Sequence, residues 1–115
     1  MRTITLAVIV SFASLASYGA ELDGKTLFQE NCAKCHGETG KGGTKEIKGP
    51  RLVGDASKWN EKTFARAVLE GKDDEGRALK GAMPHWKDTS FQSDHGTAPT
   101  KEEVASIHKY LRTVK

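Results

Sequence analysis

Apolar residues recur at helical spacing in three segments of the chain. The first segment runs from about Gly24 into the stretch that contains the cysteines, and Leu27 and Phe28 form its apolar edge. Asp23, directly before it, has the short polar side chain of an N-cap residue. This pattern predicts a helix that leads into the cysteine cluster.

The second and third segments carry capping residues at their ends. In NEKTFARAVLEG, Asn60 stands at the N-cap position and Gly71 at the C-cap position. In TKEEVASIHKYLRTV, Thr100 and Glu103 form a capping box. The apolar positions that share one face of each of these two helices are Phe64, Ala67, Val68, Val104, Ile107 and Leu111.

No stretch of the sequence shows the alternation of apolar and polar residues that is typical of a half-buried strand. We therefore predict a mostly α fold with three or more helices joined by long loops. Loops of this length are unusual in an ordinary small domain. They are expected where the chain wraps a cofactor that supplies part of the core.

The start of the chain has the pattern of a secretory signal peptide over residues 1–20. Arg2 gives a short positive region, an apolar run follows, and small residues precede a cleavage site near Gly19 or Ala20. The apolar run is shorter than the roughly 20 residues that a membrane-spanning helix needs. We therefore expect export to the periplasm, with residues 21–115 as the mature domain.

The mature chain of about 95 residues is the size of one small domain. Loss of Arg2 with the signal peptide lowers the formal net charge from +3 to +2. Such a weak charge gives no reason to expect binding to nucleic acid. A domain of this size buries a modest fraction of its surface, so a bound cofactor would form a large part of its core.

The only two cysteines, Cys32 and Cys35, stand in the motif C-x-x-C-H, which ends at His36. A redox-active disulfide of the thioredoxin type would normally follow a strand, and none is predicted here. A zinc site would need further ligands at short spacing, which the remaining histidines do not offer; these are His85, His95 and His108.

Attachment of a c-type haem explains every residue of this motif. Two thiols at i and i+3 lie on one face of a helical turn, where each can form a thioether to a vinyl group of the porphyrin. The next residue, His36, is then placed to be the proximal iron ligand. A carbonyl group near Pro50 is a candidate acceptor for its outer N–H, which would fix the tautomer of the ring.

Met83 is the only methionine outside the predicted signal peptide, in the loop GRALKGAMPHW. A thioether sulfur is a known sixth ligand that raises the potential of haem iron. Pro84 favours an extended backbone at Met83, which suits a side chain projected towards a metal. His85 is the rival ligand, whereas His95 and His108 are expected to face solvent or to form structural hydrogen bonds.

The sequence resembles the class I c-type cytochromes, the monohaem cytochrome c family. The matching stretches are GKTLFQENCAKCHG, GPRL, the MP pair and IHKYLRTV. By this resemblance the fold is a small cytochrome c fold around one covalently bound haem c, attached at Cys32 and Cys35 and ligated by His36 and Met83. The family packs its first and last helices across each other through a glycine and aromatic residues, and the residues in those positions are Gly24, Phe28 and Tyr110.

Two tryptophans and a polar stretch are left over by this match. Trp59 and Trp86 are candidates to cover apolar surface, and the indole N–H of Trp86 is the better candidate donor to a haem propionate. The stretch KDTSFQSDHGTAP after Met83 reads as a polar insertion.

The expected function is that of a soluble, monomeric one-electron carrier rather than an enzyme. Its electron donor and acceptor would be redox proteins. An acidic docking face on such a partner would fit a lysine-rich face on this chain. The lysines expected on that face are Lys34, Lys41, Lys45, Lys48, Lys80 and Lys87. Two other functions are compatible with the motif. One is a gas sensor or peroxidase-like enzyme with an open distal site, and the other is a cytochrome subunit of a dehydrogenase complex.

Overall fold

The computed structural model describes residues 23–43 and 49–115. The predicted signal peptide therefore lies outside the described residues. The helices, in chain order, are α1 (Gly24–Asn31), α2 (Ala33–His36), η2 (Ala56–Lys58), α3 (Glu61–Glu70), η3 (Trp86–Asp88), η4 (Gln92–Asp94) and α4 (Lys101–Thr113), where η marks a 3₁₀ turn.

Within the described residues the only β pairing is an isolated bridge between Lys72 and Ala78. This confirms the prediction of a mostly α fold with long loops. None of the helices in residues 23–43 and 49–115 is long and apolar enough to cross a membrane.

The predicted capping residues begin the three longer helices. The Asp23 carboxylate accepts from the N–H groups of Lys25 and Thr26 at the start of α1, at 3.1 and 3.3 Å. Asn60 Oδ1 accepts from Thr63 N–H at 2.8 Å at the start of α3. These bonds satisfy donors that have no partner inside the helix.

The C-terminal end of α3 and the start of α4 also carry the predicted capping residues. Gly71 ends α3 in the left-handed region, with φ 67°, a conformation that glycine adopts without steric cost. At the start of α4, Glu103 N–H donates to Thr100 Oγ1 at 3.1 Å and Thr100 N–H donates to Glu103 Oε1 at 2.9 Å. The capping box is therefore complete.

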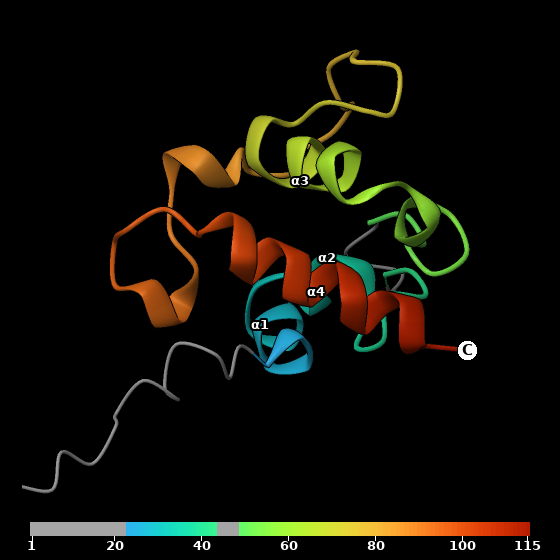
Figure 1. Cartoon of the computed structure of the whole chain (residues 1–115), viewed down its shortest axis with the longest axis horizontal. Helices are drawn as coiled ribbons and strands as arrows, with labels where there is room; N and C mark the ends of the chain where they lie inside the picture. Colours follow the sequence, from blue (N-terminus) through green and yellow to red (C-terminus); the bar gives the residue numbers. More distant parts are fainter. Residues whose placement is uncertain (1–22, 44–48) are drawn as a thin grey trace, which may run out of the picture.

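The first and last helices, α1 and α4, pack against each other (Figure 1), and Gly24 lies at their contact. A Cβ placed on Gly24 would overlap the backbone carbonyl of Ser106, so the two backbones approach more closely than any other residue would allow. The rings of Phe28 and Tyr110 pack beside this contact, with centroids 5.8 Å apart and planes tilted by 46°. The expected glycine-and-aromatic crossing is confirmed.

The core lies between α1, α3 and α4, and Figure 1 shows α3 on the other side of α4 from α1. Its buried apolar side chains are Leu27, Phe28, Val53, Ala56, Phe64, Val68, Phe91, Val104, Ile107 and Leu111. All the apolar positions predicted for α3 and α4 are buried.

Phe91 is a core residue in the stretch KDTSFQSDHGTAP, which was predicted to be a polar insertion. Its side chain is 1% exposed, and its ring packs edge-on against Trp86 at a centroid distance of 4.9 Å. The next residue, Gln92, donates its N–H to Asn31 Oδ1 at 2.8 Å, which joins this stretch to the end of α1. The stretch therefore has a structural role in closing the core.

Candidate functional site

The two cysteines and His36 lie on a separate helical turn. As predicted, a helix leads into the cluster: α1 ends at Asn31, and Cys32, its C-cap, has φ −120° and ψ −30°. The α2 turn then carries Cys35 and His36 and ends at Gly37 with φ 82°. The C-x-x-C-H motif therefore spans a break between two helical segments, which the local pattern did not predict.

His36 has the geometry of a metal-binding histidine. Its side chain is buried, and Nδ1 lies 2.9 Å from the Pro50 carbonyl oxygen. Since a carbonyl can only accept, Nδ1 carries the proton and Nε2 keeps a free lone pair. The predicted contact with the carbonyl near Pro50 is confirmed. It fixes both the tautomer and the direction of the ring, as the outer partners of metal-bound histidines do.

The backbone around His36 forms a close-fitting cradle. Gly49 N–H donates to Cys35 O at 2.7 Å and Gly42 N–H donates to His36 O at 2.8 Å. A Cβ placed on Gly49 would overlap the Cys35 carbonyl and would stand 3.0 Å from His36 Nδ1. Glycine is thus required at position 49 for the loop that brings Pro50 onto the histidine. The Gly-Pro pair was the sequence signal for this contact.

The two thiols are not joined by a disulfide. Cys35 is exposed, whereas Cys32 is partly buried against the apolar core. Burial, with a smaller effect of Cys35, raises the pKa of Cys32 to about 12, so this thiol is neutral at pH 7. A neutral thiol suits a thioether in an apolar setting and does not suit a reactive thiolate.

A zinc centre has no support in the part of the chain that the structure describes. No group of three or more His, Cys, Asp or Glu side chains there is arranged to hold a metal ion. His36 and the two cysteines gather on one turn, but the other histidines lie elsewhere.

Met83 lies in the loop between α3 and η3, and its side chain is half-buried against the core. His85 is exposed, and its ring lies over the end of α3, where a Cβ placed on Gly71 would overlap it. The structure thus gives His85 a packing contact on Gly71, while Met83 keeps an apolar setting that suits a thioether ligand.

The other two histidines match the structural roles predicted for them. His108 is buried, with Nε2 3.0 Å from the Ser57 carbonyl and its ring stacked on Phe64 at a centroid distance of 4.4 Å. Burial, followed by the nearby charge of Arg112, lowers the pKa of His108, so its imidazole is neutral at pH 7. His95 is exposed in a left-handed turn.

Several apolar side chains pack on the core but remain partly open to solvent. They come from α1, the 49–59 loop, α3 and the segment around η3, and among them are Cys32, Leu52, Trp59, Leu69, Met83 and Trp86. Together with the free Nε2 of His36 and the neutral thiol of Cys32, they offer a porphyrin the donors and the apolar cover that it needs. The residues present therefore fit a covalently attached haem.

The comparison with protein families decides the assignment. Residues 22–115 match the model of the cytochrome c family. The chain belongs to the cytochrome c family. Searches of curated proteins and of solved structures gave no match.

Membership in the cytochrome c family explains the fold and the C-x-x-C-H motif together. Members of the family carry haem c with its iron, attached covalently, and transfer electrons. In this cytochrome c, Cys32 and Cys35 stand in the arrangement used for that attachment.

Proposed function

We propose that this cytochrome c is a soluble periplasmic electron carrier whose haem iron is held by His36 and Met83. The observation that carries the proposal is the buried His36 imidazole, whose Nδ1–H is engaged by the Pro50 carbonyl at 2.9 Å. That bond leaves Nε2 unprotonated and oriented, directly after two cysteines in C-x-x-C-H spacing.

Each residue of the site has one task in this proposal. Cys32 and Cys35 would form the thioethers to the haem, and His36 would supply a nitrogen ligand to its iron. Met83 would supply a sulfur ligand, which would favour the ferrous state and raise the potential of the iron. The bound haem supplies the chemistry, namely the gain and loss of one electron at iron. The indole N–H of Trp86 is our candidate donor to a propionate.

Filled axial positions separate a carrier from an enzyme. With both His36 and Met83 bound, no position is open for oxygen, peroxide or another small ligand. We therefore propose that the protein has no enzymatic activity of its own. The sensor or peroxidase-like alternative requires Met83 off the iron, and the dehydrogenase-subunit alternative requires a permanent partner.

The holoprotein is expected to be reduced and reoxidised reversibly by one electron per haem. It should not speed the loss of hydrogen peroxide above the rate in buffer alone. Potentiometry, followed by the visible spectrum, measures the first quantity, and loss of peroxide absorbance measures the second. The unmutated protein and a Met83→Ala variant should be compared, since only the variant has an open position. Peroxide turnover by the unmutated protein would contradict the carrier function.

We further propose that the redox partner presents an acidic docking face. Four of the lysines near the site are exposed: Lys34, Lys41, Lys80 and Lys87. Neither of the two ion pairs in the described part of the chain involves a lysine, so these charges are available to a partner. Lys45 and Lys48, which the sequence analysis included in this face, lie outside the described residues.

Electron transfer to an acidic redox protein should slow as salt is added. We expect the bimolecular rate constant to fall by about tenfold between about 0.01 and 0.15 M ionic strength, where the screening length shortens from about 30 to about 8 Å. Stopped-flow mixing measures this rate. Lys80→Gln and Lys87→Gln should lower the low-salt rate, whereas Lys109→Gln on α4 should not. A rate that does not change with salt would exclude a positive docking face.

A further inference from the structure

The chain that links α3 to the Met83 loop forms a short hairpin from Gly71 to Leu79. The hairpin closes where Leu79 N–H donates to the Gly71 carbonyl at 2.8 Å. Lys72 and Ala78 form the antiparallel bridge inside it. The hairpin therefore returns the chain to the C-terminal end of α3 just before the loop that carries the proposed distal ligand.

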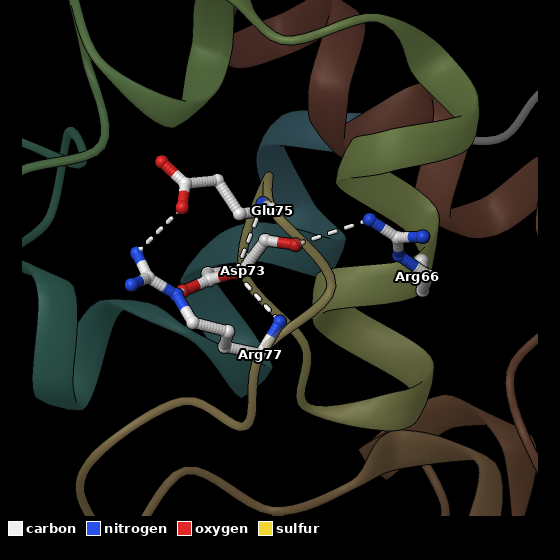
Figure 2. A network of polar contacts seen from close by, with 4 residues as sticks. All are labelled: Arg66, Asp73, Glu75 and Arg77. Carbon is white, nitrogen blue, oxygen red and sulfur yellow. Dashed lines mark hydrogen bonds and ion pairs between the residues drawn. The ribbon is translucent and has the colours of Figure 1, made fainter.

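Asp73 holds this hairpin together from inside (Figure 2). Its Oδ1 accepts from the N–H groups of Glu75 at 2.9 Å and Arg77 at 2.8 Å, and its own N–H donates to Arg77 O at 2.7 Å. Gly76 N–H donates to Asp73 O at 3.0 Å. The backbone hydrogen bond from Arg77, more than any other cause, lowers the pKa of Asp73. The carboxylate is therefore ionised and able to accept at neutral pH.

Arg66 joins the hairpin to α3. Its Nη2 donates to the Asp73 carbonyl at 3.2 Å, as Figure 2 shows. The Arg77 side chain forms ion pairs with Asp73 at 3.3 Å and with Glu75 at 3.0 Å, but it is 70% exposed, and such surface pairs add little stability. Besides the bond that closes the hairpin at Gly71, the backbone hydrogen bonds to Asp73 and the bond from Arg66 are thus its main constraints.

The segment that follows has few contacts of its own. No backbone hydrogen bond joins residues 80–84 to the rest of the described chain. Gly81 adopts φ 118°, and no atom lies within 4 Å of a Cβ placed on it. After Met83, η3 packs against α3 and Trp86 packs on Phe91. The backbone of this segment is therefore held at its two ends, while the Met83 side chain packs on the core, and the hairpin is the upstream end.

We propose that Asp73 is a positioning residue for Met83. By closing the hairpin it fixes the point at which the 80–84 segment leaves α3, and so it sets how firmly the thioether is kept at the iron. Loss of the Asp73 carboxylate leaves the N–H groups of Glu75 and Arg77 without their acceptor. The hairpin, and with it the start of the 80–84 segment, is then less constrained. The inference rests on the proposed ligation by Met83.

The test is a titration of the ferric holoprotein with imidazole, which competes with Met83 for the sixth position of the iron. Asp73→Ala is expected to bind imidazole about tenfold more tightly than the unmutated protein, the effect of losing hydrogen bonds to a charged acceptor. Asp73→Asn keeps Oδ1 as an acceptor and should remain close to the unmutated affinity. Asp74→Ala removes the same charge at an exposed neighbouring position and should have no effect.

Circular dichroism, recorded well below the thermal unfolding midpoint, checks that each variant keeps its helices. An unchanged imidazole affinity in Asp73→Ala would overturn the inference. An equal gain in Asp74→Ala or Asp73→Asn would assign the effect to lost charge and would overturn it as well. Met83→Ala reports on the function itself: if it binds imidazole no more tightly than the unmutated protein, Met83 does not occupy the iron and the proposed ligation fails.

Discussion

Replacement of Met83 by alanine is expected to leave a folded protein with covalently attached haem and one open axial position. The thioethers at Cys32 and Cys35 and the proximal His36 remain, so the haem stays in place. The iron should become high-spin, and the reduced protein should bind carbon monoxide. The potential should fall by on the order of 0.1 V, within the roughly 0.8 V over which axial ligands tune haem proteins. Visible spectroscopy and potentiometry measure these changes.

His85→Ala is the matched comparison for Met83→Ala. The two residues lie in the same loop, but His85 is exposed and its ring packs over Gly71. Its loss should leave the iron low-spin, closed to carbon monoxide and nearly unchanged in potential. The reverse result, in which His85→Ala opens the iron and Met83→Ala does not, would assign the ligand to His85 and lower the expected potential of the unmutated protein.

The double variant Cys32→Ala with Cys35→Ala, expressed with an export signal, is expected to give almost no folded protein. A small domain buries a modest share of its surface, so the bound haem is expected to supply part of the core. Without covalent attachment the protein loses that part of its core, and binding free energy that contributes to folding is lost with it. The yield of exported protein and a thermal melt followed by circular dichroism measure the loss.

Glu38→Ala is a suitable control for the double cysteine variant. Glu38 is exposed, follows the C-x-x-C-H motif closely, and takes no part in the contacts that hold His36. This variant should be recovered with normal yield and haem content. A stable apoprotein that melts cooperatively after loss of both cysteines would show that the polypeptide core suffices by itself.

Apart from the α1–α4 crossing, which the family resemblance implied, most of the features that were predicted correctly from the sequence have local causes. Asp23 and Asn60 cap the neighbouring N–H groups, and Gly71 adopts the left-handed conformation that ends α3. The capping box at Thr100 is a contact between residues three apart. The carbonyl of Pro50 was also expected to meet His36, because the chemistry of a metal-bound histidine requires an outer acceptor.

The features that were missed depend on contacts between distant segments. The chain leaves helical geometry at Cys32, where no capping side chain marks the break. Phe91 stands alone among polar residues, and only the fold places it against Trp86 in the core. The hairpin around Asp73 has a turn signal in the sequence D-D-E-G, but its link to Arg66 on α3 is tertiary.

The central claim is that His36 and Met83 fill both axial positions of the haem iron. Exposure of the reduced, unmutated holoprotein to carbon monoxide tests it most directly, with reduced Met83→Ala as the positive control. The account predicts that the visible spectrum of the unmutated protein stays unchanged while that of the variant shifts. Ready binding of carbon monoxide by the unmutated protein would contradict the account and would favour a sensor or an enzyme with an open distal site.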